Sequence, residues 1–453
     1  MSLSIRCRTL ALALTTLLAA PRVEAADGAP SNTPPPVPVT RRPPSRRQER
    51  SKQNQPRLPL PPLTAEEKAK ADQGDWSVVN NGRMRSTYLP AEFTGAGFTR
   101  QPDPGMTLGY PFQTMIFWVV SRGNNCTYCL GHQESKLAAA GVTDETIAAL
   151  DGDWASFTAA ERAAFALAKK LTYEPHTVSA ADIERLRPHY NDNQILEILL
   201  VTGNFNAMNR WTGALRIPQE DHRVYVTAAN DALKSNTVAS HIAPLATAAE
   251  SSNGGLVAPA PSHRPALESR AQVEAAIEAA VQRAPRIALA DESAARAALP
   301  EGWNPSSVPQ WARLLATFPK AGGARIALHH ASETAGQLDH LLAARIAWTA
   351  ARHDRAWYAL ADARRRLHDL GQTDDQIFAL DQPAEDSALT PADRAALALA
   401  RKVTTDPAQI TDADVEAVRK HFSDHKTAEV IWHATEAAFF NRVTEAAGLQ
   451  PGK

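Results

Sequence analysis

The chain has very few cysteines. Its 453 residues include three, Cys7, Cys126 and Cys129. A secreted protein that relies on disulfides for stability normally has more pairs, and these close longer loops. Only two residues separate Cys126 from Cys129, so a bond between them would close almost no loop. We therefore expect this pair to serve chemistry or a metal site rather than general stability.

An excess of charge of one sign is also absent. Lysine and arginine number 48, aspartate and glutamate 49, and the formal net charge is −1. This balance gives no global electrostatic argument for binding nucleic acid, and we expect none as a partner. Glycine is modest and alternation of β-branched with aromatic residues is scarce, which favours helices. No run of about 20 apolar residues follows the N-terminus, so we expect no membrane span in the mature form.

The first residues have the pattern of an export signal. Arg6 and Arg8 are positive, Leu10 to Ala20 is apolar, and small residues around Ala25 suit a cleavage site. An uncleaved anchor is the alternative, but the apolar run is short for a spanning helix. We predict that residues 1–26 are a signal peptide and that the protein is exported, to the periplasm or the exterior of a bacterium.

The remaining chain divides by composition into four segments. Residues 27–75 are rich in proline and arginine and predict a disordered linker. Residues 76–226 predict a helical domain that contains the C-x-x-C pair. Serine, alanine, proline and glycine replace periodic sequence at residues 227–268, which predicts a second linker. Residues 269–453 predict a second, cysteine-less repeat of the helical domain.

The repeat is inferred from matches in fixed register. Gly141–Asp144 and Ile147–Asp151 match Gly371–Asp374 and Ile377–Asp381, and Thr158–Ala164 matches Thr390–Ala396 after a shift of two residues. Such agreement over about 100 residues is unlike chance similarity between alanine-rich helices. The register also pairs isolated positions: Pro175 with Pro407, Asp182 with Asp414, His189 with His421, and Asn209-Arg210 with Asn441-Arg442.

Each predicted repeat reads as a string of helices with visible start signals. Thr158-x-x-Glu161 and Ser179-x-x-Asp182 are capping boxes, in which hydroxyl and carboxylate satisfy free backbone amides. Residues 195–201 are apolar on most sides, which predicts a central, buried helix. The predicted fold class is all-α. The corresponding boxes of the second repeat are Thr390-x-x-Asp393 and Thr411-x-x-Asp414.

The context of the cysteine pair favours a reactive thiolate. Gly123 and Asn125 break one helix just before the pair, which would then begin the next helix. Free amides and the positive end of the helix dipole favour a thiolate there. His132 follows Cys129 by three residues on the same helical face and could exchange a proton with it.

Other uses of the pair stay open at this point. A c-type haem site needs histidine directly after the second cysteine, where Leu130 stands, and a thioredoxin motif needs a βαβ context. An inert pair in a structural helix is possible. A zinc site of Cys126, Cys129 and His132 lacks a fourth ligand nearby. We favour a redox dithiol with no cofactor and no metal. Distant candidates for that fourth ligand are His176, His189 and His222.

These residues resemble a known family. An all-helical domain with Asn124-x-Cys126-x-Tyr128-Cys129 and a histidine on the next turn is similar to the carboxymuconolactone decarboxylase/alkylhydroperoxidase D-like superfamily. Asn209-Arg210 at the end of the buried helix is also similar. The resemblance covers roughly residues 110–220 and, more faintly, 340–450. It implies a tandem repeat of two alkylhydroperoxidase D-like helical domains, the second degenerate. Known members include thiol-dependent peroxidases and lactone decarboxylases.

The resemblance implies roles for individual residues. Cys129 would attack a peroxide and Cys126 would resolve the sulfenic acid into a disulfide, while a histidine and an upstream glutamate relay the proton. Two positions depart from the family pattern: Gln133 stands where the histidine is common, with His132 one position early, and Thr114 stands where the glutamate is expected. We therefore expect thiol–disulfide or weak peroxide chemistry rather than a fast peroxidase.

The second repeat lacks the reactive groups. Ala356, Ala359 and Asp362 align with the two cysteines and His132, whereas Tyr358 matches Tyr128. We expect this repeat to be structural and to supply half of a helical pair.

The predicted function is an exported thiol-dependent oxidoreductase that acts with Cys126, Cys129 and His132. Its partners would be a small peroxide or thiol substrate and an unknown thiol reductant. Its quaternary arrangement would be a homo-oligomer or an intramolecular domain pair. A non-catalytic helical scaffold and a lactone decarboxylase-like enzyme are the alternatives.

Overall fold

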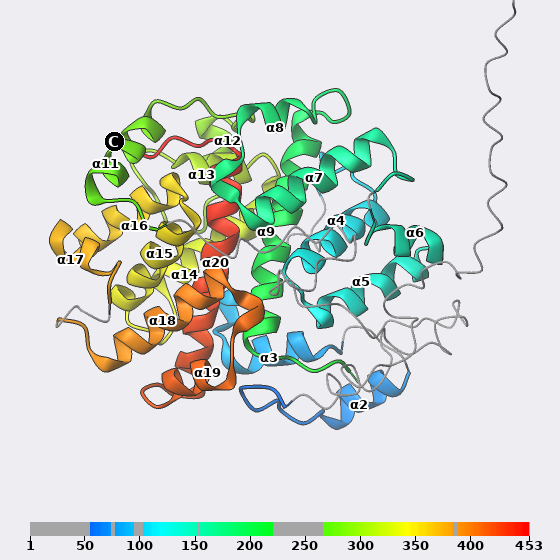
Figure 1. Cartoon of the computed structure of the whole chain (residues 1–453), viewed down its shortest axis with the longest axis horizontal. Coiled ribbons are helices and arrows are strands. Elements are labelled where there is room, and N and C mark those ends of the chain that lie inside the picture. Colours follow the sequence, from blue (N-terminus) through cyan, green and yellow to red (C-terminus); the bar gives the residue numbers. More distant parts are fainter. Residues whose placement is uncertain are drawn as a thin grey trace, which may run out of the picture. The chain divides into compact units, whose positions relative to one another are not determined.

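The described chain is helical throughout. Its regular elements are eighteen α-helices and three short 3₁₀ helices, with no strand, so the predicted all-α class is confirmed (Figure 1). In this part of the chain, no helix is both long enough and apolar enough to cross a membrane. The computed structural model describes residues 55–73, 78–94, 103–152, 154–220, 266–383 and 388–452.

Two sets of helices make up the described chain. We call residues 78–220 the N-terminal region and residues 266–452 the C-terminal region. The N-terminal region contains α3 (Asn80–Tyr88), η2 (Ala91–Phe93), α4 (Tyr110–Gly123), α5 (Thr127–Ala139), α6 (Asp144–Ala149), α7 (Ala159–Tyr173), η4 (Pro175–Thr177), α8 (Ala180–Glu184) and α9 (Asp192–Ala214). The C-terminal region contains α11 (Arg270–Val281), α12 (Glu292–Ala297), α13 (Gln310–Leu315), α14 (Pro319–Thr334), α15 (His340–Asp354), α16 (Trp357–Asp369), α17 (Asp374–Ala379), α18 (Pro391–Thr405), η6 (Pro407–Gln409), α19 (Asp412–Arg419) and α20 (Asp424–Ala446).

The predicted helix starts are present. Thr158, Ser179, Thr390 and Thr411 are the N-caps of α7, α8, α18 and α19, and each forms a capping box with the acidic residue three positions later. These boxes satisfy amides that have no partner within the helix. The helix boundaries were therefore predictable wherever a cap and an apolar face occur together.

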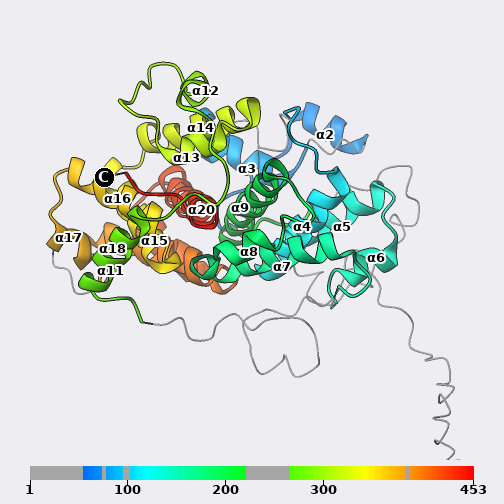
Figure 2. The ribbon, with the colours of Figure 1, turned by 90° about the horizontal axis from the view of Figure 1, so that it is seen from above.

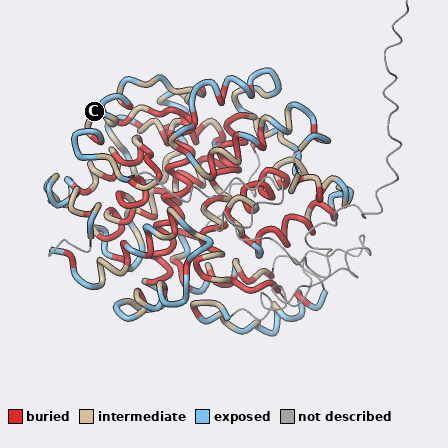
Figure 3. Tube along the Cα trace, viewed as in Figure 1, coloured by how far each residue is buried: buried red, intermediate tan, exposed pale blue. Residues whose placement is uncertain are grey.

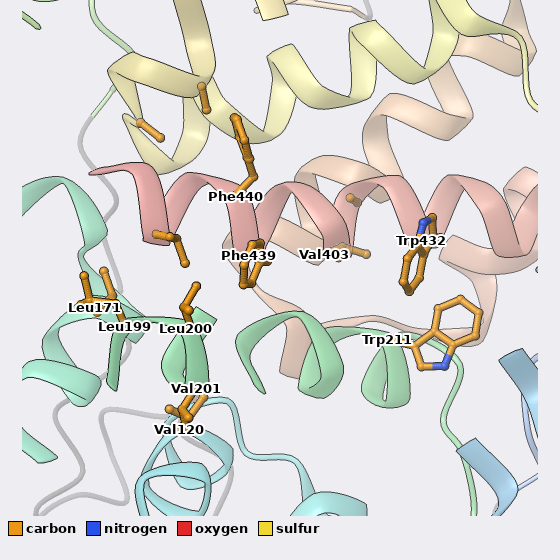
Figure 4. Packing of buried hydrophobic residues seen from close by; sticks show 14 of the residues in the cluster. Val120, Leu171, Leu199, Leu200, Val201, Trp211, Val403, Trp432, Phe439 and Phe440 are labelled. Carbon is orange, nitrogen blue, oxygen red and sulfur yellow. The ribbon is translucent and has the colours of Figure 1, made fainter. Parts of the chain in front are cut away.

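The two regions meet along α9 and α20, the longest helices, which lie side by side (Figures 1 and 2). Residues 195, 196 and 198–201 of α9 are fully buried, as predicted for a central helix. Phe439 of α20 points towards α9, whereas Phe440 points to the opposite side (Figure 4). Burial is greatest along these central helices and least in the connecting turns (Figure 3).

Several interactions in one region have a counterpart in the other. Arg122 pairs with Asp151, and Arg352 pairs with Asp381 at the positions given by the predicted repeat. Likewise, Glu197 accepts backbone hydrogen bonds from residues 107 and 108, and Glu429 accepts them from residues 337 and 338.

The N-terminal segment differs from its prediction. Residues 55–73 fall within the expected disordered linker of residues 27–75, yet Leu58 is fully buried and α2 spans Ala65–Asp72 behind a capping box at Thr64. The composition suggested a solvated chain, but local caps and one buried leucine anchor this part, so the prediction is wrong for residues 55–73. The predicted signal peptide, residues 27–54 and most of the 227–268 linker lie outside the described residues.

Candidate functional site

The turn between α4 and α5 places the cysteine pair. Asn125 has a left-handed backbone with φ of 52°, which asparagine tolerates better than most residues. The amide of Asn125 donates to the carbonyl of Arg122, and the amide of Cys126 donates to that of Ser121. These two bonds form a Schellman-type end to α4. The chain therefore reverses just before Cys126.

Cys126 is the N-cap of α5, so the pair lies at the start of this helix, as Gly123 and Asn125 led us to expect. The sulfur of Cys126 accepts a hydrogen bond from the amide of Cys129 at 3.2 Å. The two cysteines are joined as a disulfide with their Cα atoms 5.3 Å apart. Both residues are buried, at 5% and 2% exposure. A thiolate at Cys126 would face an amide that begins the helix, and one at Cys129 would lie in the first turn, where the helix dipole favours negative charge.

A hydroxyl from α9 contacts both sulfur atoms. Thr212 Oγ1 lies 3.2 Å from the sulfur of Cys126 and 3.3 Å from that of Cys129. It is also within hydrogen-bond distance of the carbonyls of Met208 and Asn209. The hydroxyl has a single proton, and it can turn from a carbonyl to a sulfur when a thiolate forms.

A buried polar network holds this turn against α9. Asn124 Nδ2 donates to the side-chain oxygens of Asn206 and Asn209, and Asn124 Oδ1 accepts from Arg210 Nη1 at 3.0 Å. Arg210 also donates to Asn206 Oδ1 at 2.8 Å. The sequence analysis singled out Asn209 and Arg210. Both therefore hold the cysteine turn in place through their hydrogen bonds to Asn124.

The histidine of the site pairs with a carboxylate that the sequence analysis missed. His132 Nε2 lies 3.0 Å from Glu220 Oε2, while Tyr128 Oη and the amide of Asn80 each donate to Glu220 Oε1 at 2.7 Å. The Glu220 side chain is fully buried. Burial, followed by the Glu220 charge and hydrogen bond, raises the pKa of Tyr128 well above its usual value. Tyr128 thus stays protonated and orients the carboxylate.

Glu220 lies far from the motif in sequence, in the segment that follows α9. The adjacent Gln219 donates to the carbonyls of Thr127 and Tyr128 across Gly131. A Cβ on Gly131 would lie 2.8 Å from Gln219 Nε2, so glycine allows this close approach. One signal in the sequence could have pointed to Glu220. In the predicted repeat register Glu220 aligns with Gly452, so the second repeat lacks this carboxylate just as it lacks the cysteines.

The two departures from the family pattern have structural counterparts. Thr114 Oγ1 donates to the carbonyl of Tyr110 within its own helix, so Thr114 supplies no carboxylate. Gln133 Nε2 donates to the carbonyl of Cys129 at 3.2 Å. The carboxylate next to the site histidine thus comes from Glu220 instead of from α4.

The site opens onto a cavity of about 460 Å³. Cys129 and His132 line it together with Thr114 and Gln133, whereas Cys126 is not part of the lining. Cys129 is therefore the cysteine that a molecule in the cavity would meet. This volume falls in the range of pockets that hold small organic ligands.

The corresponding turn of the C-terminal region keeps the backbone but not the chemistry. Arg355 has φ of 53°, close to the 52° of Asn125, and Ala356 is the N-cap of α16. Tyr358 Oη accepts from the amide of Trp311, just as Tyr128 accepts from Asn81. A cavity of only about 40 Å³ adjoins Ala359 there. Without sulfur, this turn cannot perform thiol chemistry.

The zinc alternative lacks a ligand set in the described chain. No group of three or more histidine, cysteine, aspartate or glutamate side chains is arranged there to hold a metal ion. His132 has Glu220 as a hydrogen-bond partner. His222, one of the candidates for a fourth ligand, lies outside the described residues.

Comparison with known proteins agrees with the motif. Residues 112–170 match the model of the carboxymuconolactone decarboxylase family, which confirms the resemblance. The matched segment covers most of α4, all of α5 and α6, and most of α7, and so contains both cysteines and His132. No curated protein matches the chain.

Proposed function

We propose that this protein is a thiol-dependent oxidoreductase that reduces a peroxide with Cys129 and closes a disulfide with Cys126. The observation that carries this proposal is the place of Cys129. It lies in the first turn of α5, contacts the sulfur of Cys126 and lines a cavity together with His132. The match of residues 112–170 to the family supports it.

The reaction has two steps. The Cys129 thiolate attacks one peroxide oxygen, the O–O bond breaks, and the products are a sulfenic acid and an alkoxide that takes up a proton. The Cys126 thiol then attacks the sulfenic sulfur, which forms the disulfide and releases water. In total, two thiols and one hydroperoxide give one disulfide, one alcohol and one water. An external dithiol restores the two thiols and is itself oxidised.

We assign the proton relay to His132 and Glu220. His132 would take the proton of the Cys129 thiol and return it to the alkoxide, because both residues face the same cavity. Glu220 would hold the ring and stabilise its protonated form through the 3.0 Å contact. In this chain Glu220 would replace the glutamate that is missing at Thr114.

The proposal can be tested by trapping the sulfenic acid. We expect reduced Cys126→Ser protein, treated with a hydroperoxide and dimedone, to form an adduct at Cys129 that mass spectrometry locates. Cys129→Ser protein, the matched control, should form none at Cys126. Equal labelling of both variants, or of neither, would reject the assigned roles.

Two further measurements separate this proposal from its alternatives. In a scaffold with a permanently closed disulfide, the Cys126–Cys129 bond of the wild-type protein would resist reduction by dithiols. A decarboxylase acting on a lactone would not need the thiols, so replacing both cysteines by serine would leave its activity in place.

The wider architecture is part of the proposal. We take the two regions to be repeats of one domain that pair within a single chain through α9 and α20. The corresponding ion pairs Arg122–Asp151 and Arg352–Asp381 support this reading. We also propose that the protein acts outside the cytoplasm, on the pattern of residues 1–26.

A further inference from the structure

The cavity beside Cys129 is built by both regions. The C-terminal region contributes residues of α14 and α20, among them Arg325, Trp432 and Glu436. These side chains line the same cavity as Cys129, although their own region has no cysteine. The C-terminal region therefore has a role in this site even though it has no thiols.

Arg325 is the most distinctive of these groups. It is 8% exposed, its Nη2 donates to Glu436 Oε1, and its guanidinium lies 3.6 Å from the centre of the Phe439 ring. Within the described chain, Nη2 is the only nitrogen of this guanidinium with a hydrogen-bond partner, and Nε is buried without one. A buried N–H group without a partner is costly. Arg325 thus has donors left for a ligand in the cavity that it lines.

The described lining of the cavity carries more positive than negative charge. Arg85, Lys136 and Arg325 contribute three cations, and Glu436 is the one carboxylate among the described lining residues. Arg85 lies over the ring of Trp432, 4.9 Å from its centre. The cavity wall therefore favours a ligand that bears negative charge.

Six aromatic side chains also line the cavity, among polar and small residues. A molecule as small as hydrogen peroxide would use little of a cavity of about 460 Å³. Pockets of this size with a few placed polar groups bind organic molecules. The aromatic residues that line the cavity are Tyr110, Phe117, Tyr128, Phe205, Trp211 and Trp432.

We infer that the cavity binds organic hydroperoxides that carry a carboxylate, with Arg325 of the C-terminal region recognising the carboxylate and the aromatic wall holding the apolar body. That the ligand has a carboxylate and an apolar body is inferred from the cavity alone. Its identity as a hydroperoxide rests on the proposed function. Arg325 is thus a specificity residue supplied by the region without cysteines.

The test uses a matched pair of ligands on the full-length protein. Linoleic acid hydroperoxide and its methyl ester differ in the negative charge, and the corresponding hydroxy acid and hydroxy ester do not react with thiols. We expect isothermal titration calorimetry on the disulfide form to show roughly tenfold tighter binding of the hydroxy acid than of its ester, as for a charge-assisted hydrogen bond. Equal affinities would overturn the inference.

Variants then assign the preference to one residue. Arg325→Gln should reduce the acid-to-ester affinity ratio to about one. Since this change strands the buried carboxylate of Glu436, the double variant Arg325→Gln/Glu436→Gln is the safeguard, because it removes both charges and keeps hydrogen-bonding groups. A ratio that stays near its wild-type value in a folded variant would show that Arg325 is not the recognition group.

Turnover is measured separately from binding. Reduced protein is assayed with linoleic acid hydroperoxide and its ester, and the kcat/KM ratio should follow the affinity ratio. If the acid binds selectively but is not reduced, the proposed function fails and the carboxylate site stands. If both hydroperoxides are reduced at equal rates, the function stands and the carboxylate site fails.

Discussion

Glu220 adds a buried carboxylate to the site that the first turns of α5 form around the two cysteines. Its fully buried carboxylate accepts from Tyr128 and contacts His132, so the ring of His132 is held in one orientation. A neutral amide at this position would keep most of the shape but would no longer stabilise a protonated imidazole.

We expect Glu220→Gln to lower the rate of peroxide reduction by roughly 10- to 100-fold, the usual cost of losing a supporting carboxylate. Stopped-flow fluorescence with reduced protein measures this rate. Glu134→Gln is the control, because Glu134 lies on α5 with His132 but accepts a hydrogen bond from Trp118, and its rate should stay near that of the wild type. Equal losses in both variants would contradict a specific relay.

His433 contributes to the response of the fold to acid. Burial, with a further contribution from Arg366, lowers the pKa of His433 to about 3. Between that pKa and the unfolded value of 6.5 the unfolded chain binds the extra proton, so stability falls as the pH falls. We expect His433→Gln to make the free energy of unfolding, measured with urea between pH 7 and pH 4, less steep by up to about 1.4 kcal/mol per pH unit. An unchanged slope in His433→Gln protein would contradict this account.

At the scale of elements, local signals in the sequence predicted much of the fold. The capping boxes at Thr158 and Thr390 and the mostly apolar stretch at residues 195–201 could be predicted from neighbouring residues alone, and all are present. The break before Cys126 was predictable from Gly123 and Asn125 for the same reason. Glu220 was not, because its contact with His132 spans 88 positions and depends on how the segment after α9 folds back.

In the N-terminal segment, residues 55–73, composition gave a wrong prediction. Proline-rich composition predicted a disordered linker, whereas Leu58 is buried and Arg57 is held by distant carbonyl groups. Composition averages over a segment and cannot register one or two anchoring residues within it.

The α9–α20 contact depends on a glycine. A Cβ on Gly203 would lie 2.7 Å from Val443 Cγ2 and 3.1 Å from Phe439 Cδ2. We expect Gly203→Ala to lower the free energy of unfolding by about 1–3 kcal/mol through overpacking. Gly213→Ala, later in α9, meets only a carbonyl oxygen at 3.9 Å and should be neutral or stabilise by up to about 1 kcal/mol. Urea unfolding of both variants checks this, and a stabilised Gly203→Ala would contradict the packing.

At the scale of the whole molecule, the N-terminal segment connects the two regions. Arg57 donates to the carbonyls of Gly213 and Ala214 at the end of α9 and also to Ile410 and Asp412 of the C-terminal region. Its side chain is 8% exposed. Hydrogen bonds to helix-end carbonyls from a buried cation stabilise more than a surface ion pair does.

We expect Arg57→Met to lower the free energy of unfolding by about 2–4 kcal/mol, since several buried carbonyls lose their donor. Arg185→Met is the control, because Arg185 is 73% exposed and pairs with Asp182 at the surface; it should cost less than about 1 kcal/mol. Thermal unfolding followed by circular dichroism compares them, and similar losses would show that Arg57 is an ordinary surface arginine.

The distribution of the cavity wall along the chain has a consequence for biosynthesis. Cys129 lies in the first third of the sequence, whereas Trp432 and Glu436 belong to the last helix, which ends at Ala446 of 453 residues. A nascent chain therefore carries both cysteines long before it carries the helix that encloses them. Only a fully synthesised chain has a complete site, and a product shortened within α20 would present the cysteine pair without its enclosing wall.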